Sequence, residues 1–208
     1  MKINKPKYKI IYQSKENVWG KLKNAKKLKN QKWKKFVKKL DKINIYKNIK
    51  KPRSLKVLFK QRLVNKQKFK SFYGNLSYSI LKKEYVHIKK KNSFNIIDRL
   101  IISLEKRLDI FLYRVGLFST IFEAKQAINH NKLKVNGIIV SNGNYKLKPG
   151  DYINIPENNN NVNLINLPYI QINKELSLIV FLKNPDIKEI KYPFNLNKRF
   201  LFEYLNKK

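Results

Sequence analysis

The chain has 208 residues, a formal net charge of +35 and no cysteine. Its length suggests one or two domains, and a content of 42% hydrophobic residues excludes a wholly disordered polycation. The lack of cysteine excludes disulfides, thiol chemistry and zinc–thiolate sites, and two distant histidines, His87 and His130, make a histidine metal site unexpected, so neither metal nor cofactor is predicted.

Positive charge is concentrated in the first part of the chain. Residues 1–91 hold 31 of the 48 Lys and Arg residues but few acids, which gives a net charge of +28 against +7 for residues 92–208. Such a segment repels itself, so we expect it to become compact on a polyanion. Nucleic acid is the first candidate and an anionic membrane surface the second. No apolar run approaches the ~20 residues of a membrane-spanning helix, so membrane insertion is not expected.

The amino-terminal region places aromatic residues among its lysines. Tyr8, Lys9 and Trp19 fit an arm with an aromatic anchor. In the lysine-dense range 21–51, apolar residues recur at helical spacing: Trp33, Phe36, Val37 and Leu40. This pattern predicts a basic amphipathic helix, which suits an RNA or a membrane surface, although a charge run is also typical of a solvated face.

A second helix is predicted over residues 55–73, after Pro52. One side of it carries apolar residues: Leu55, Leu58, Phe59, Leu63, Phe69 and Phe72. Lys68, Lys70 and Tyr73 lie at its end. Residues 84–92 are interpreted as a link to a further helix over 96–105.

Residues 107–155 predict two short helices followed by strands. Leu108, Phe111, Leu112 and Val115 form one apolar helix face, and Gly116 suits the helix end. Thr120 and Glu123 fit a capping box that opens the next helix. In that helix Phe122, Ala127 and Ile128 are expected to pack inward, and Lys125, Gln126 and His130 to face outward.

The strands are predicted from a change of period to two. Leu133 and Val135 alternate with Lys132 and Lys134 before the hairpin signal Asn136-Gly137. Lys148-Pro149-Gly150-Asp151 predicts a second turn, followed by a strand over 152–155. Later strands are expected over 167–172 and 176–182, and a closing helix over 198–208.

Arg107 and Arg114 are seven residues apart, two helical turns, and are expected on the outer side of the first helix of this pair. Each is either an RNA ligand, since a guanidinium fork suits phosphate, or a partner of Asp109 or Glu105. Asp109 is expected to be structural. The chain has neither GxxxxGK[ST] nor GxGxxG, and no acid pair in a setting that favours acid–base catalysis, so no enzyme is predicted.

Together these motifs resemble the small RNA-binding module named after the fourth protein of the small ribosomal subunit. They are RLDxxxYRxG at 107–116, STxxEAxQxxxH at 119–130, VNG at 135–137 and YxxKPGD at 145–151. Glu16-Asn17-Val18-Trp19-Gly20 is similar to the ENxWG of alphaproteobacterial and mitochondrial members, and Tyr73-Gly74 to another family element. The chain departs from the family at Ile121, where arginine is usual.

The resemblance to the S-four family of small-subunit ribosomal proteins implies an α+β fold in three regions. Residues 1–93 would be a basic, mostly helical rRNA-binding region, 94–160 the RNA-binding module, and 161–208 strands and a helix that complete the body. The implied RNA contacts are Tyr8, Lys9, Trp19, Lys68, Lys70, Tyr73, Arg107, Arg114, Ser119, Thr120, Lys125, Gln126, His130, Lys132 and Lys134.

The implied function is that of a structural constituent that binds the 5′ domain of small-subunit rRNA early in assembly. By the same resemblance it lies near the mRNA entry channel, beside the fifth and third small-subunit proteins. Its lysine-rich, alanine-poor composition indicates an AT-rich gene. This favours an organelle-encoded mitochondrial protein, with another organelle or an AT-rich organism as alternatives. A free RNA-binding regulator, a protein associated with RNA modification and a basic membrane-surface protein are the competing functions.

Overall fold

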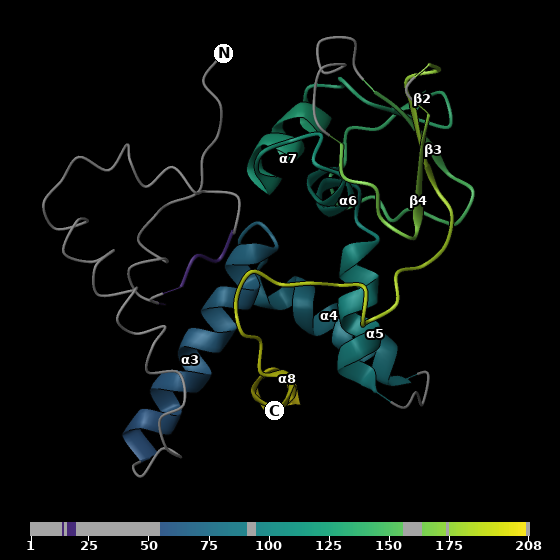
Figure 1. Ribbon diagram of the computed structural model, residues 1–208. Helices are drawn as coiled ribbons and strands as arrows, with labels where there is room; N and C mark the ends of the chain where they lie inside the picture. The colour runs from purple at the N-terminus through teal and green to yellow at the C-terminus, as the bar shows by residue number, and fades with distance from the viewer. Residues whose placement is uncertain are drawn as a thin grey trace, which may run out of the picture. The chain divides into compact units, whose positions relative to one another are not determined.

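A computed structural model describes residue 14 and residues 16–19, 55–90, 95–155, 164–173 and 175–206. Over these residues the chain forms six helices and a five-stranded antiparallel sheet, which confirms the predicted α+β class (Figure 1). The described residues fall into two compact units. One lies within Leu76–Lys191, and the other combines the described residues before Leu76 with those after Lys191. The predictions for Tyr8, Lys9 and the helix in 21–51 lie outside the described residues.

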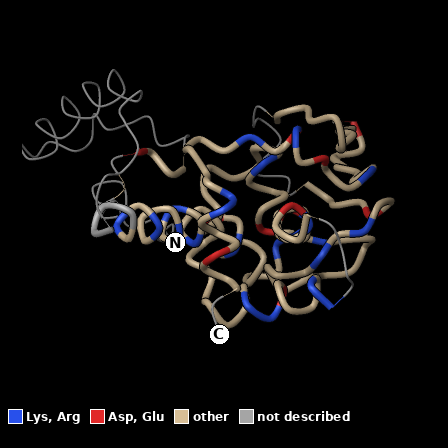
Figure 2. Tube along the Cα trace, turned by 90° about the horizontal axis from the view of Figure 1, so that it is seen from below, with Lys and Arg blue, Asp and Glu red and all other residues tan. Residues whose placement is uncertain are grey.

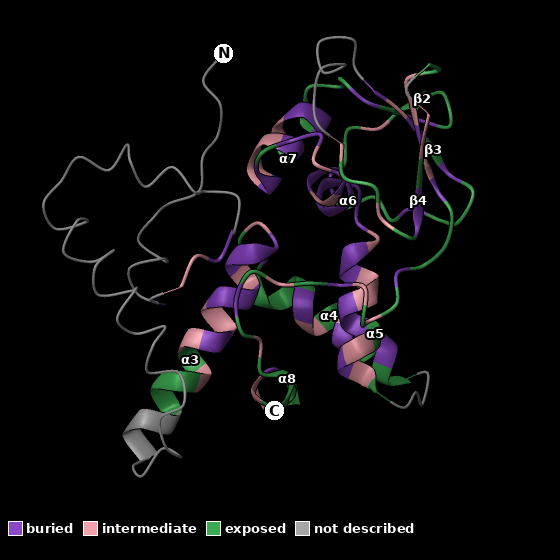
Figure 3. Cartoon of the chain, in the orientation of Figure 1, coloured by how far each residue is buried: buried purple, intermediate pink, exposed green. Residues whose placement is uncertain are grey.

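One unit is built on α3 (Leu55–Phe72), against which α8 (Lys198–Asn206) packs. Figure 3 shows α3 changing from exposed to buried along its length. Phe69 and Phe72 are fully buried, as predicted, but Phe59 is 66% exposed. The expected apolar face is therefore confirmed only in the second half of α3, where Phe72 meets Tyr192 and Phe194 in edge contacts.

The other unit begins with a pair of helices, α4 (Tyr78–Lys90) and α5 (Ile96–Glu105). The helix expected over 96–105 is confirmed. The interpretation of residues 84–92 as a link is wrong, because α4 continues to Lys90. Leu81, Tyr85 and Ile88 recur at i, i+4 and i+7 and are buried, so apolar spacing extends the helix through this segment.

The module predicted over residues 94–160 continues this unit. Its helices α6 (Leu108–Val115) and α7 (Ile121–Asn129) lie on one side of a sheet with strand order β2-β1-β3-β5-β4 (Figure 1). The strands are β1 (Lys134–Val135), β2 (Ile138–Ile139), β3 (Tyr152–Asn154), β4 (Ile170–Asn173) and β5 (Leu178–Phe181). Val135 pairs with Ile153 and Ile153 with Ile179, and these buried residues join the apolar faces of α6 and α7 in one core.

Both predicted turns are confirmed. Asn136 and Gly137 connect β1 to β2 with φ of 52° and 78°, the double left-handed geometry of a type I′ turn. In the second turn the Asp151 N–H donates to the Lys148 carbonyl at 3.0 Å, and Gly150 has a φ of 95°. That places proline and glycine where a type II turn favours them.

The later part of the chain completes the same sheet. β5 pairs with β3 on one side and with β4 on the other, so the sheet continues across residue 160. The three-region division by RNA binding stays a prediction. Within the described ranges, no helix has the length and apolar character needed to cross a membrane.

Candidate nucleic-acid interface

The exposed polar surface of the module follows α7 and β1. Ala124, Ala127 and Ile128 are buried on the inner side of α7, which turns Lys125 and His130 to solvent and leaves Gln126 half-buried. Two further lysines are exposed after the helix, because Lys132 and Lys134 alternate with the buried Leu133 and Val135. The predicted outward orientation is confirmed for Lys125 and His130 and only in part for Gln126. Figure 2 shows basic residues outnumbering acidic ones along the described trace.

The start of α7 is closed by its own side chains. Thr120 Oγ1 accepts a hydrogen bond from the Glu123 N–H at 3.1 Å, which confirms the predicted cap. The Glu123 carboxylate accepts from the Ser119 N–H at 3.1 Å and from the Ser119 hydroxyl at 2.6 Å, rather than from Thr120. In a standard capping box the Glu123 carboxylate would accept from the N–H of the cap residue Thr120, whereas here it accepts from the preceding residue, Ser119. A negative charge here opposes a phosphate at this helix end.

Arg107 does not lie on the outer side of a helix, so its expected exposure is wrong. It is 4% exposed, and its guanidinium donates two hydrogen bonds to Asp109, which confirms the structural role expected of Asp109. Arg107 is the N-cap residue of α6, with extended backbone and an isolated bridge to Lys146. Because it precedes the helix, the seven-residue spacing to Arg114 does not become two helical turns.

Asp109 is held in a low-polarity site that Arg107 balances. Burial raises the pKa of the Asp109 carboxyl, and the Arg107 guanidinium opposes that shift. Asp109 Oδ1 also accepts the Ile110 N–H at 2.9 Å, and the Asp109 N–H donates to the Gly143 carbonyl at 3.3 Å. The Asp109 backbone thus joins the start of α6 to the loop before β3.

Arg114 is also engaged within the protein. Its Nη2 lies 2.7 Å from Glu105 Oε1 and its Nε 2.9 Å from Glu105 Oε2, while Nη1 donates to the Lys191 carbonyl at 2.6 Å. The Glu105 side chain is 1% exposed and the Arg114 side chain 15%. The expectation that Arg107 and Arg114 share the outer side of one helix is therefore wrong, because both arginines bind buried carboxylates.

Three of the predicted amino-terminal contacts are interior residues. Trp19 is 1% exposed, and its Nε1 donates to the Ser71 carbonyl at 3.2 Å. Lys68 is 7% exposed and lies 2.9 Å from Glu16 Oε2, and the Tyr73 hydroxyl lies 2.6 Å from that of Tyr192. Lys70, by contrast, is half-buried. An RNA contact by the first three stays a prediction that their burial does not support.

Comparison with known proteins places these features in a family. The S4 domain matches residues 106–153, which span α6, α7, β1 and β2 and reach into β3. Small ribosomal subunit protein uS4 of Maricaulis maris (strain MCS10) is 31% identical over 156 residues, which cover 70% of this chain and 76% of that protein. The chain belongs to the uS4 family.

Other uS4 relatives extend the match. The uS4 protein of Orientia tsutsugamushi (strain Boryong) is 29% identical over 214 residues, which cover 98% of both chains. A uS4m protein of Reclinomonas americana is 32% identical over 164 residues, which cover 70% of this chain and 65% of that protein. The uS4 similarity therefore includes both compact units.

One ion pair of this uS4 chain was not predicted from its sequence. Lys146 Nζ, in the module, lies 2.7 Å from Glu84 Oε2 on α4 and 3.1 Å from the Ser103 hydroxyl on α5. Recognising α4 from the spacing of Leu81, Tyr85 and Ile88 would have placed Glu84 on a helix. Across the described part of the chain, no group of His, Asp or Glu residues is arranged to hold a metal ion.

Proposed function

We propose that this chain is a structural constituent of the small ribosomal subunit that binds small-subunit rRNA and is not an enzyme. Membership of the uS4 family carries this proposal, since the relatives bear the name of a small-subunit protein and the Orientia match covers 98% of both chains. The S4 domain at 106–153 and the net charge of +35 support the RNA partner.

The mode of binding is neutralisation of phosphates together with recognition of RNA shape. The exposed residues Lys125, His130, Lys132 and Lys134 are the proposed phosphate contacts of the module. Arg107 and Arg114 act indirectly, because their guanidinium groups hold Asp109 and Glu105 and thereby fix α6. The resemblance supports a site on the 5′ domain, near the mRNA entry channel and the third and fifth proteins.

A mitochondrial ribosome is the proposed location. The lysine-rich, alanine-poor composition and the 32% identity to a uS4m protein support it. Bacterial relatives have similar identity, 31% for Maricaulis, so the finer assignment depends on fractionation. Organelle fractionation of the source cell, with an antibody to this chain, tests it.

Sedimentation tests the proposed function as a whole. A lysate of the source cell is run on a density gradient at low salt, and the chain is followed with an antibody. A ribosomal protein moves with small-subunit rRNA and shifts with it when the subunits are separated. A chain that stays light contradicts the proposal and favours a free regulator. A chain that floats with lipid favours a membrane-surface protein.

A further inference from the structure

A hollow follows the edge of the sheet at β4. This strand is the last in the order β2-β1-β3-β5-β4, and among the described strands it pairs with β5 alone. Side chains alternate along a strand, so Ile170 and Ile172 point to one face of the sheet and Gln171 and Asn173 to the other. All four residues line a hollow of about 780 Å³, the β4 groove. The β4 groove therefore runs along the strand edge rather than over one face.

The backbone of β4 presents hydrogen-bonding groups at this edge. The Leu182 N–H donates to the Tyr169 carbonyl at 3.0 Å, so the polar backbone groups of Tyr169 face β5. These groups alternate in direction along an antiparallel strand, which turns those of Ile172 away from β5. No turn or cap hydrogen bond within the described ranges reaches the Ile172 N–H or carbonyl. A donor and an acceptor are thus presented as they are to an added strand.

The edge at β4 lacks the usual protection against pairing. Exposed edge strands are commonly very short, or carry lysine, proline or a bulge. The strand β2, at the other edge, has only two residues. By contrast, β4 has the sequence Ile-Gln-Ile-Asn, and all four residues pair with β5 in one continuous register. Its composition and regular pairing are typical of a strand that accepts another strand.

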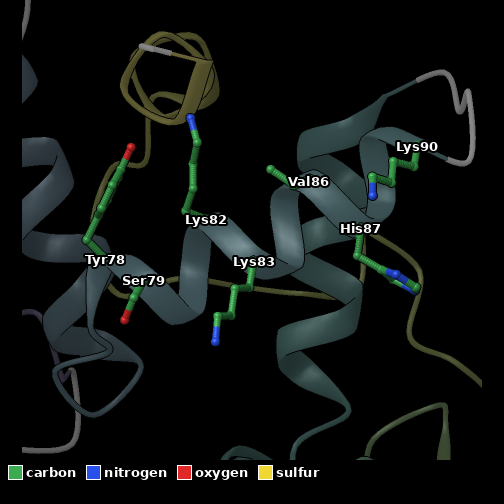
Figure 4. Close-up of a pocket in the computed structure, with 7 residues that line it drawn as sticks. All are labelled: Tyr78, Ser79, Lys82, Lys83, Val86, His87 and Lys90. Atoms are coloured by element: carbon green, nitrogen blue, oxygen red, sulfur yellow. The ribbon is translucent and has the colours of Figure 1, made fainter.

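The charge of the β4 groove differs from that of a surface suited to RNA. The hollow beside α4 has about 560 Å³ and four basic residues in its lining (Figure 4): Lys82, Lys83, His87 and Lys90. The described lining of the β4 groove has no basic residue, and its one charged residue is the exposed Glu175. Lys174 lies outside the described residues. An RNA backbone would therefore meet a carboxylate here, whereas a basic peptide would meet a partner.

We propose that the β4 groove binds an extended, basic segment of a neighbouring protein of the subunit, which adds to the sheet as a strand beside β4. The proposal rests on the proposed function, which places the chain in a particle with other proteins. The Ile172 N–H and carbonyl pair with the backbone of the segment, and Leu164 and Leu182 contact its apolar side chains. A lysine or arginine of the segment pairs with Glu175. A second copy of this chain is disfavoured, because its net charge of +35 repels a like charge.

Site-directed crosslinking tests the partner in the assembled particle. The chain has no cysteine, so Gln171→Cys, an exposed position of the β4 groove, gives a single attachment point for a benzophenone maleimide. After assembly into small subunits and irradiation, we expect a crosslink to a lysine- or arginine-containing segment of one other protein, identified by peptide mass spectrometry. Ile138→Cys, which is 71% exposed at the opposite edge of the sheet, is the control and should not give this crosslink.

The remaining crosslinking outcomes contradict the proposal. A crosslink from position 171 to rRNA alone shows that the edge faces RNA. A crosslink to this chain itself or to a second copy shows that the groove is occupied without another protein. The same protein reached equally from positions 171 and 138, or no crosslink from position 171, also overturns the proposal.

A charge reversal tests the basic character of the partner. Glu175→Lys, made in the Gln171→Cys chain, places a cation in the β4 groove and should lower the crosslink yield roughly two- to fivefold, the range of an exposed ion pair. Asp186→Lys makes the same change in net charge outside the groove, at a side chain that is 75% exposed, and should leave the yield unchanged. Equal yields from the two variants overturn the proposal of a basic partner.

The outcomes separate this proposal from the proposed function. If the unaltered chain does not enter small subunits, the proposed function fails. If it enters them and position 171 gives no crosslink to another protein, only the proposal for the β4 groove is overturned. Thermal unfolding of the Gln171→Cys chain should match that of the unaltered chain, because Gln171 is exposed. The affinity of the free chain for rRNA should be the same with Glu175→Lys as with Asp186→Lys.

Discussion

The Arg107 guanidinium makes a bidentate ion pair with the Asp109 carboxylate, with Nη2 2.6 Å from Oδ2 and Nε 3.1 Å from Oδ1. Both side chains are almost fully buried. Around them, the Leu108 N–H donates to the Tyr145 carbonyl and the Leu147 N–H to the Lys106 carbonyl, each at 2.8 Å. This pair of neighbours in sequence therefore fixes the junction at which the module begins.

Arg107→Ala is expected to lower the free energy of unfolding by about 3–5 kcal/mol, because it leaves the Asp109 carboxylate buried without its partner. Urea denaturation of the two proteins measures the change. Arg107→Met/Asp109→Leu, which removes both charges, should recover much of the loss. An Arg107→Ala protein of normal stability that binds rRNA poorly would show instead that the arginine faces RNA.

Trp19→Ala should destabilise the protein by about 3–5 kcal/mol, since it empties a buried site and removes the hydrogen bond to Ser71. Phe59→Ala is the matched control, because Phe59 is 66% exposed and its removal should change stability little. Denaturant unfolding of both variants gives the comparison. If Trp19→Ala keeps normal stability and loses RNA affinity, the tryptophan is a ligand and not an anchor.

Lys132→Gln/Lys134→Gln should weaken rRNA binding and leave the melting temperature unchanged, because both side chains are exposed. Each lost phosphate contact should lower the salt slope by about 0.7–0.9. Binding titrations at several salt concentrations measure it. Lys148→Gln/Lys188→Gln removes the same charge elsewhere, and an equal effect of both pairs would mean that the module has no preferred face.

Tyr113 predicts a stability change at alkaline pH. Burial raises the pKa of Tyr113 to about 12, although Arg114 opposes the shift. The unfolded chain releases this proton near pH 10, so its contribution is fully present below pH 10 and is lost as the pH rises toward 12. The loss is about 2–3 kcal/mol. Tyr113→Phe should therefore lose less stability between these pH values than the unaltered chain, and parallel curves in urea denaturation would contradict this.

Gly150→Ala should cost about 1–2 kcal/mol through backbone strain, since Gly150 has a φ of 95°. An added Cβ meets no atom within 4 Å, so crowding does not contribute. Gly150→Asn should cost less, because asparagine adopts left-handed conformations more readily. Thermal unfolding measures both, and an equal loss for the two variants would point away from backbone strain.

Local signals in the sequence determined much of the module. Gly116 ends α6 with a φ of 91°, Thr120 caps α7, and Asn136-Gly137 forms the β1–β2 turn. Each signal acts through the backbone geometry or hydrogen bonds of residues within a few positions of it. The turn or helix end that it forms can therefore be predicted without knowing the tertiary structure. Missing α4 was an error of interpretation, because Leu81, Tyr85 and Ile88 already carried helical spacing.

Only the tertiary structure decided which polar and aromatic residues reach solvent. Trp19 binds the carbonyl of Ser71, 52 residues away, and Tyr73 meets Tyr192, 119 residues away. Arg114 finds a buried carboxylate on the preceding helix and a carbonyl 77 residues away. A periodic pattern gives the side of a helix on which a residue lies, but burial depends on what packs there. That partner comes from chain topology, so Arg107 and Lys125, which were both predicted to contact RNA, have opposite exposure.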